Sequence, residues 1–315
     1  MPSHSLATPV QGAFIELQQL IEARFIAQGI NINKQQRALS QLIGQHKSLL
    51  KGRGLDFAEV RHYQAGDDIR SIDWRVTARS SKPHTKIFNE ERERPVLIIN
   101  DQRQAMFFGS QHCFKATLAC YLSALFGWAA IQQGDRVGGL VFNDSNHKDC
   151  RPKASRKALL SFFQQCTDFN HQLDSHTVVE KPTSESLKET LIELRRVAKP
   201  GSHIILISDF SGFQDPGIEE QLHILARHCQ LTALFIFDNL EKTLPSSGYY
   251  NITNGVNKTS FFSGDKQLQK HYQDQFHEKL NALQQLFLRL KTPLIPIATH
   301  QAPLDVLLTY YHRSQ

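Results

Sequence analysis

Long hydrophobic runs are missing from this 315-residue chain. The longest apolar run, Leu118–Ile131, is too short to span a membrane and contains polar residues, so it predicts a buried helix instead. The first twelve residues lack a basic stretch followed by an apolar core, so we expect no signal peptide. We therefore predict a cytoplasmic protein without an integral membrane segment.

Paired cysteines and metal-binding motifs are missing as well. The five cysteines are odd in number, and none of them forms a CxxC pair. No HExxH motif or Cys/His zinc pattern is present. We expect free thiols in a reducing compartment and no transition-metal site.

The chain also lacks the common motifs of nucleotide binding and catalysis. It has no GxxxxGK[ST] P-loop, no GxSxG nucleophile elbow and no GxGxxG after a strand. Its net charge of +6 is mild and its basic residues are balanced locally, so we expect no nucleic-acid partner. These absences favour a protein that is not an enzyme.

Charge is concentrated in residues 51–95, which contain ten basic and eight acidic side chains. Apolar residues such as Trp74 are threaded between them, whereas a disordered charged tail would lack such anchors. Because unpaired charges beside these apolar side chains would be costly, we expect a folded network of ion pairs. Asp67 is a plausible N-cap of a helix, and the alternative is an irregular turn followed by a strand over 84–89.

The remaining sequence divides into a helical start and a long alternating region. Helical periodicity predicts two amphipathic helices over 14–28 and 35–50. After Pro95, apolar strands alternate with helices, which predicts an α/β fold with a doubly wound, mostly parallel sheet. The expected strands are 96–101, 136–142, 147–152, 203–209, 231–238 and 294–299.

The sequence also predicts a hairpin, three parts of the chain and the helices of the third part. Asn254-Gly255 predicts a β-hairpin near residues 249–262. We expect three parts: an N-terminal helical segment (1–50), a charged module (51–95) and an α/β domain (96–315). The helices expected in the third part are 115–132, 155–166, 185–197, 219–228, 266–290 and 304–311.

Three of the apolar strands end in an aspartate: Asp101, Asp209 and Asp238. Ligand sites of open parallel sheets lie beyond the carboxyl ends of the strands, where the strand order reverses. Aspartate is also common after a strand as a turn former and helix cap. Both interpretations remain open, but Asp101 and Asp209 end two of the most hydrophobic strands, so their side chains could converge.

From about residue 50 to its end, the sequence resembles the bacterial family called domain of unknown function 58. The most specific string is YQAGDDIRSIDW, within the charged module. This string and its flanking residues contain the signature residues Arg61, Tyr63, Gly66, Asp67, Asp68, Arg70, Asp73, Trp74 and Arg79. The resemblance is carried by GRGLDF (52–57), VRHYQAGDDIRSIDWRVTAR (60–79), VLIIND (96–101) with Met106, ILISDF (205–210), FDNLEKTLP (237–245) with Gly248 and Tyr249, and TYYHR (309–313).

This resemblance implies a von Willebrand factor A-like fold and association with a MoxR-type AAA+ ATPase. Members of the family typically act in the assembly, insertion or maturation of another protein. We therefore predict a non-enzymatic interaction module, an adaptor or co-chaperone of the ATPase that acts on an unknown client protein. In addition, the charged module could lock the N-terminal part onto the α/β domain.

The alternative is a metal-dependent hydrolase or nucleic-acid-acting enzyme that uses clustered carboxylates to hold metal ions. Its candidate residues are Asp67, Asp68 and Asp73, or Asp101 and Asp209. Each acid of the GDDIRSIDW string has an arginine within three positions, which favours ion pairing over metal capture.

The resemblance also implies a metal-ion-dependent adhesion site, which uses Asp-x-Ser-x-Ser, a later Thr and a later Asp to hold Mg²⁺. Residues 101–105 read Asp-Gln-Arg-Gln-Ala, so both serine hydroxyls are missing, while Thr183 and Asp209 fit the later positions. We expect a degenerate site without a metal cofactor; any metal would use Asp101, Thr183 and Asp209. We hypothesise that the Arg103 guanidinium replaces the metal and pairs with Asp101 and Asp209, the alternative being that it points into solvent. We expect Asp101, Arg103, Thr183 and Asp209 to form the binding face.

Overall fold

The computed structural model describes residues 9–32, 60–63, 74–79, 82–86, 94–174, 183–253 and 258–311. The chain forms two compact units, of which the smaller is His46–Glu93. The larger unit combines Met1–Gln45 with Arg94–Gln315. Residues 1–45, most of the N-terminal segment expected to be separate, therefore group with the α/β unit.

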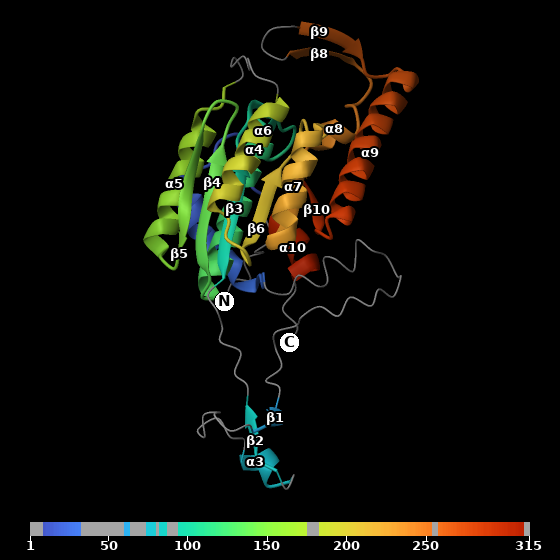
Figure 1. The fold of residues 1–315 in the computed structure, drawn as a ribbon. Coiled ribbons are helices and arrows are strands. Elements are labelled where there is room, and N and C mark those ends of the chain that lie inside the picture. Colours follow the sequence, from blue (N-terminus) through green and yellow to red (C-terminus); the bar gives the residue numbers. More distant parts are fainter. Residues whose placement is uncertain are drawn as a thin grey trace, which may run out of the picture. The chain divides into compact units, whose positions relative to one another are not determined.

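The larger unit is built on a six-stranded sheet in the order β10-β7-β6-β3-β4-β5 (Figure 1). All neighbouring strands are parallel except β5, which pairs with β4 in antiparallel orientation at the edge. The strands are β3 (Pro95–Asp101), β4 (Arg136–Phe142), β5 (His147–Lys153), β6 (His203–Ser208), β7 (Gln230–Phe237) and β10 (Leu294–Ala298). The mixed α/β fold with a mostly parallel sheet, predicted from the sequence, is confirmed.

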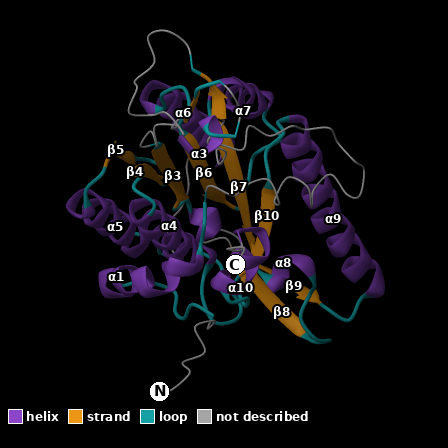
Figure 2. Ribbon diagram, turned by 90° about the horizontal axis from the view of Figure 1, so that it is seen from below, coloured by secondary structure: helices purple, strands orange, loops and turns teal. Residues whose placement is uncertain are grey.

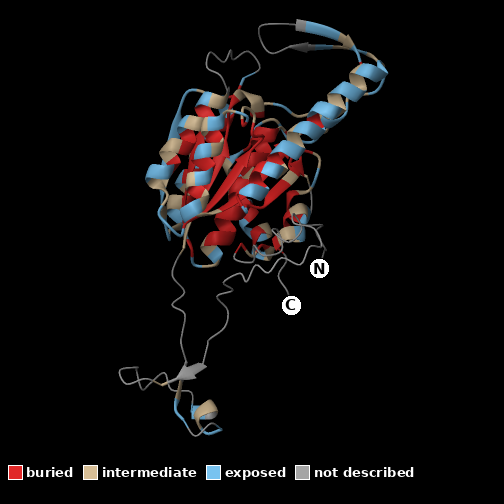
Figure 3. Cartoon of the chain, turned by 45° about the vertical axis from the view of Figure 1, so that its right-hand side comes forward, coloured by how far each residue is buried: buried red, intermediate tan, exposed pale blue. Residues whose placement is uncertain are grey.

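Helices cover both faces of this sheet (Figure 2). In β3, Ile98 packs with the helices on one face, whereas Leu97 and Ile99 pack on the other, as the two-residue period of a strand requires. One face is covered by α1 (Leu17–Ile26), α4 (Lys115–Gln132), α5 (Arg156–His171) and α10 (Pro303–Tyr311), and the other by α6 (Thr183–Val197), α7 (Pro216–His228) and α9 (Lys266–Arg289). Figure 3 shows the sheet buried between these layers, with the outer helix faces exposed.

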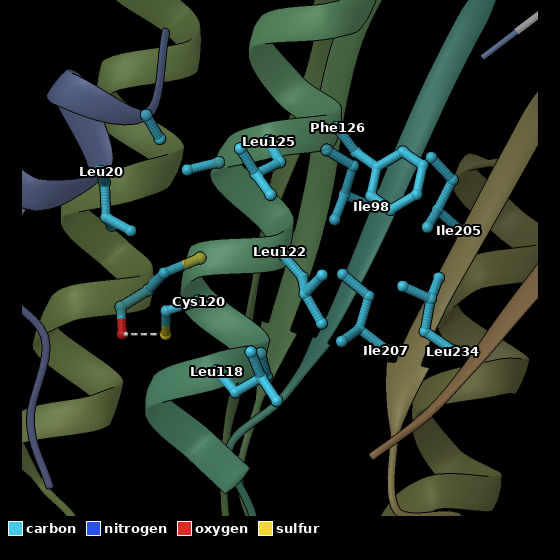
Figure 4. Close-up of a cluster of buried hydrophobic side chains, with 14 of the residues drawn as sticks. Leu20, Ile98, Leu118, Cys120, Leu122, Leu125, Phe126, Ile205, Ile207 and Leu234 are labelled. Carbon is cyan, nitrogen blue, oxygen red and sulfur yellow. Dashed lines mark hydrogen bonds between the residues drawn. The ribbon is translucent and has the colours of Figure 1, made fainter. Parts of the chain in front are cut away.

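Helix α4 is the centre of one layer, because it lies between the sheet and α1 (Figure 4). Leu122 and Phe126 face strand residues such as Ile207 and Ile98, while Leu20 of α1 packs from the other side. The buried apolar residues of 115–130 explain the hydrophobic run in the sequence. No described helix is both long and apolar enough to cross a membrane.

Side-chain caps explain where several helices begin. Ser155 caps α5, and Asp215 caps α7 with Pro216 in its first turn, so α7 begins earlier than residue 219. Asp265 caps α9 by accepting hydrogen bonds from the backbone N–H groups of Gln267 and Leu268. Helix α5 continues to His171, five residues beyond the expected end, because its last turns bury Phe169 and Asn170.

Outside the main sheet, β8 (Tyr249–Thr253) and β9 (Lys258–Phe262) form the expected antiparallel hairpin. The Asn-Gly pair at its turn lies outside the described residues, as do the expected helix over 35–50 and residues 87–89 of the expected strand. Three short elements are 3₁₀-helices or a single helical turn: η1 (Ala27–Gly29), η3 (Gln104–Met106) and α8 (Asn239–Lys242).

The smaller unit contains β1 (Val60–His62) paired with β2 (His84–Lys86), and the short helix α3 (Trp74–Thr77). Trp74 is 67% exposed, and Arg79 is also exposed. The Tyr63 backbone N–H donates to the Pro83 carbonyl oxygen. The other signature positions, Gly66 to Asp73, and the Arg61 side chain lie outside the described residues, so the expected ion-pair network stays a prediction.

Candidate functional site

The strand order reverses between β3 and β6, and this position defines the candidate site. Connections from β3 lead toward β4 and β5, while those from β6 lead toward β7 and β10. β3 ends at Asp101, and β6 ends at Ser208, directly before Asp209. The two aspartates therefore lie at the carboxyl ends of adjacent strands, where sheets of this kind bind ligands.

Arg103 joins these two acids. Its Nε lies 2.9 and 3.1 Å from the two carboxylate oxygens of Asp101, and its Nη2 lies 2.6 Å from Asp101 Oδ2. The same Nη2 is 3.7 Å from Asp209 Oδ1. Arg103 and Asp101 are 0% exposed and Asp209 is 1% exposed. The predicted pairing of Arg103 with both aspartates is confirmed, and the alternative of a solvent-directed guanidinium is wrong.

The surroundings of Arg103 hold it in place as a cation. Nη1 donates to the Ser211 carbonyl oxygen at 2.9 Å, and the guanidinium carbon lies 5.5 Å from the centre of the Phe142 ring. Burial by itself would lower the pKa of Arg103, but the carboxylates of Asp101 and Asp209 outweigh it and raise that pKa. The arginine is therefore charged at every physiological pH.

Ser208 completes the hydrogen bonding of Asp101. Its hydroxyl donates to Asp101 Oδ2 at 2.6 Å and accepts from the backbone N–H of Phe210 at 2.8 Å. Phe210 has a φ of 51°, a left-handed conformation that is strained for a large residue. The Phe210 ring lies 5.2 Å from that of Phe287 in α9, so core packing stabilises the strained turn beside the site.

A second buried cation, Lys115, extends the cluster toward α8. The Lys115 amine lies 2.9 Å from Asp209 Oδ2 and 2.8 Å from Glu241 Oε1. Burial would lower the pKa of Lys115, but Asp209 and Glu241 raise it above its ordinary value. Burial would raise the pKa of Asp209, whereas Lys115 is the strongest of the opposing influences that lower it well below its usual range. We call Asp101, Arg103, Lys115, Asp209 and Glu241 the carboxyl-end cluster.

Asp238, the third strand-end acid, has a different role. It caps α8 by accepting a hydrogen bond from the Leu240 N–H, and it accepts further bonds from Ser110 and Thr299. Burial acts to raise its pKa, but the Ser110 and Thr299 hydroxyls outweigh this and lower it. The two interpretations of the strand-end acids thus apply to different residues: Asp238 is a cap, whereas Asp101 and Asp209 converge.

Thr183 lies at the start of α6, and its side chain is outside the described part of the chain. The neighbouring Ser184 is close to the loop after β6, because a Cβ on Gly212 would come within 2.7 Å of the Ser184 backbone. Gly212 has a φ of 86° and can therefore make this approach without a side chain. The backbone of Thr183 is thereby positioned beside the loop that carries Ser211.

Sequence reasoning missed Lys115, Ser208 and Glu241. For Lys115 a signal was present, because it is the only charged residue in an otherwise apolar helical run that predicts burial. For Ser208 and Glu241 the sequence offers no comparable signal. Ser208 contacts Asp101 and Glu241 contacts Lys115 only because the tertiary fold brings these residues together.

These residues do not fit Mg²⁺. A metal at this position needs free carboxylate and hydroxyl oxygens, but both Asp101 oxygens accept from the Arg103 guanidinium, and one also accepts from Ser208. The fixed positive charge of Arg103 between the two aspartates would repel a divalent cation. Among the described residues, no group of three or more His, Cys, Asp or Glu side chains is arranged to hold a metal ion.

Comparison with known sequences gives one family and several relatives. A model of the family "Protein of unknown function DUF58" matches residues 59–281. Uncharacterised proteins from Mycobacterium tuberculosis and Mycobacterium bovis are 27% identical to this chain over 221 residues, which cover 70% of this chain and 66% of each relative. The chain thus spans slightly less than two thirds of the length of these relatives.

Three solved structures are also similar. The conserved hypothetical protein BatB from Bacteroides thetaiotaomicron has a TM-score of 0.35 at 15% identity, covering 62% of this chain and 98% of that one. An aerotolerance-related membrane protein from Bacteroides fragilis has a TM-score of 0.35 at 13% identity, covering 63% and 98%. A von Willebrand factor type A protein from Catenulispora acidiphila has a TM-score of 0.32 at 11% identity, covering 49% and 34%.

Proposed function

This chain belongs to the family of proteins of unknown function DUF58, and we propose that it is a non-enzymatic adaptor of a MoxR-type AAA+ ATPase. The observation that carries the proposal is the buried Arg103 guanidinium, bound to Asp101 and close to Asp209. A side-chain cation replaces an exchangeable ion and fixes the loops around it. The site is thereby preorganised to bind another protein.

The state of the acidic side chains supports binding rather than catalysis. A general base or nucleophile needs an available lone pair, but Asp101 and Asp209 are both engaged by cations and hydroxyl groups. The cavity beneath Ser208, between the sheet, α6 and α7, has a volume of about 10 Å³ and an almost wholly apolar lining. Such a cavity is at the lower limit for one water molecule and would not hold a substrate.

The loops around the carboxyl-end cluster provide the proposed docking face. Phe108, in the loop after β3, is 40% exposed. Asp144, in the loop after β4, is half-buried, and burial raises its pKa above the ordinary value. An exposed aromatic side chain and a partly buried acid, in loops at the same end of the sheet, suit a protein interface. The five free cysteines agree with a cytoplasmic location, where the ATPase would supply the ATP chemistry and a client protein would be acted on.

A binding experiment with a matched control tests this face. The MoxR-type ATPase encoded in the same genome is immobilised, and binding of the full chain is measured with and without ATP. We expect F108A/D144K to weaken binding by about tenfold or more, because it removes an apolar contact and reverses a charge. L288A is the control, since Leu288 is also 40% exposed but lies at the end of α9 that leads into the amino end of β10.

Two outcomes would contradict the adaptor role. One is that the wild-type chain binds the ATPase in neither nucleotide state. The other is that L288A weakens binding as much as F108A/D144K does, which would move the interface away from the carboxyl-end loops. Turnover of a phosphodiester by the wild-type chain with a divalent metal, lost in D209N, would instead favour the metal-dependent hydrolase.

A further inference from the structure

A groove with a volume of about 300 Å³ lies between α1, α4 and α5. Its lining includes Arg24 and Phe25 of α1, Trp128 and Ile131 of α4, and Arg156 of α5, and we call it the α1–α5 groove. Trp128 is thirteen residues beyond Lys115 in the same helix, which places it about 20 Å from the carboxyl-end cluster. The groove is therefore a separate site, and a ligand bound there is independent of the proposed adaptor role.

The charges at the rim of this groove are uncompensated. Arg24 and Arg156 are both exposed, and neither forms an ion pair with any residue in the described ranges. Arg156 is the first residue of α5, where the helix dipole adds positive potential to that of its guanidinium. An anionic group at the rim could therefore pair with two arginines that are not paired with any described acid.

The floor of the groove is apolar. The Trp128 indole N–H is already used, since it donates to the Leu20 carbonyl oxygen at 2.8 Å, so the ring offers only hydrocarbon surface. Ile131 lies one helical turn further along α4. Phe25 is 57% exposed, so its ring adds apolar surface beside the two arginines. The groove therefore suits an apolar side chain flanked by negative charges.

We propose that the α1–α5 groove binds an acidic peptide segment of a partner protein. Carboxylates of the segment pair with Arg24 and Arg156, and an apolar side chain between them rests on Trp128 and Ile131. A nucleic acid fits less well, because stacking of bases needs open aromatic faces. The Arg24 guanidinium lies over the Phe25 ring, 4.4 Å from its centre, and covers one of those faces.

Fluorescence anisotropy with a defined probe tests the proposal. The probe is a labelled peptide with four aspartates around one phenylalanine, and its counterpart with asparagines is the negative probe. We expect R24E/R156E to weaken binding of the acidic peptide by about tenfold or more, with a loss of affinity at high salt. The control K148E/K153E reverses the same number of charges on exposed positions of β5 and should bind as the wild type does.

Trp128 supplies a second readout. The chain has two tryptophans, so the W74F variant leaves Trp128 as the only one. Its emission should shift when the acidic peptide binds, and circular dichroism of R24E/R156E should match that of the wild type. No binding of the acidic peptide at 1 mM, equal binding of the asparagine peptide, or equal binding by R24E/R156E would overturn the proposal. Tighter binding of an oligothymidylate, lost in R24E/R156E, would overturn it in favour of nucleic acid.

Discussion

The two ends of the central sheet bury polar side chains in different protonation states. At the carboxyl end, Arg103 and Lys115 are buried as cations against aspartates. At the amino end of β6, His203 is equally buried but neutral, because burial and the nearby charge of Arg94 lower its pKa to about 3. His203 bonds to the Thr232 hydroxyl at 2.9 Å, and Nδ1 has no partner among the described residues.

This difference bears on whether the carboxyl-end cluster contributes to stability. A buried ion pair adds little stability over apolar side chains of the same volume, because desolvation offsets most of the attraction. The amino end keeps its buried histidine uncharged, which is the ordinary solution. Stability alone therefore does not explain the ion pairs of the carboxyl-end cluster, and we propose that they orient the loops around it.

The largest expected effect is that of removing the Arg103 cation. R103Q leaves the Asp101 and Asp209 carboxylates buried with one less cation, so we expect the free energy of unfolding to fall by about 3–5 kcal/mol. Urea unfolding followed by circular dichroism measures it. The control R196Q breaks the exposed pair of Arg196 with Glu193 and should change stability by no more than about 0.5 kcal/mol.

A double-mutant cycle sharpens this result. If Asp101 and Arg103 act as a pair, D101N/R103Q should be less destabilised than the sum of the two single variants. A loss below about 1 kcal/mol for R103Q would mean that the cluster is no more costly to disrupt than a surface pair, and the contrast between the two ends would disappear.

The second effect is a pH dependence that belongs to the amino end. The folded pKa of His203 is about 3 and its ordinary value is 6.5, so the unfolded chain takes up this proton first as the pH falls. Stability is therefore lost from about pH 6.5 toward pH 3, and we expect about 2 kcal/mol between pH 6.5 and 4.5 from this residue. The measurement is the difference in unfolding free energy between wild type and H203N at both pH values.

The carboxyl end titrates in a different window. The folded pKa of Asp209 is lowered, so its contribution is present above its ordinary value of 3.8 and is lost only as the pH falls below that value. H203N should therefore reduce the pH dependence of stability between pH 6.5 and 4.5. Equal pH slopes for H203N and wild type would contradict a neutral buried histidine.

The sheet could be predicted from sequence because its signals are local. Runs such as Val96–Asn100 and His203–Ser208 are buried on both faces, so these strands are visible as continuous apolar segments. The attachment of α1 could not be predicted. It depends on contacts with α4 that are more than a hundred residues away, such as the Trp128 N–H to Leu20 bond.

The site was predictable only in part. Asp101, Arg103 and Asp209 could be named, because strand ends and the missing hydroxyls are visible in the sequence. Lys115 and Glu241 could not be joined to them, since their contacts connect elements from different parts of the chain. The difference between Asp209 and Asp238 was equally hidden, because both follow apolar strands and only their partners distinguish them.

A smaller effect is expected at Asp238, where hydrogen bonds replace ion pairs. D238N places an amide N–H₂ among the donors of Ser110, Thr299 and Leu240, so we expect a loss of about 1–2 kcal/mol in unfolding free energy. The control is D265N at the exposed cap of α9, where asparagine is an equally good cap and the loss should stay below about 0.5 kcal/mol. A loss in D238N equal to that of R103Q would show that caps and ion pairs at this end are energetically alike.

The smallest effect tests whether Arg103 replaces an ion. R103S/A105S restores the Asp-x-Ser-x-Ser pattern and removes the cation that repels Mg²⁺ from Asp101 and Asp209. Thermal unfolding with and without Mg²⁺ should then show a stabilisation of about 1 kcal/mol at several times the dissociation constant, and none in the wild type. The single variant A105S, which keeps Arg103, should also be insensitive to Mg²⁺. Equal stabilisation of the wild type by Mg²⁺ would mean that the guanidinium does not exclude the ion, and its closeness to both aspartates would need another explanation.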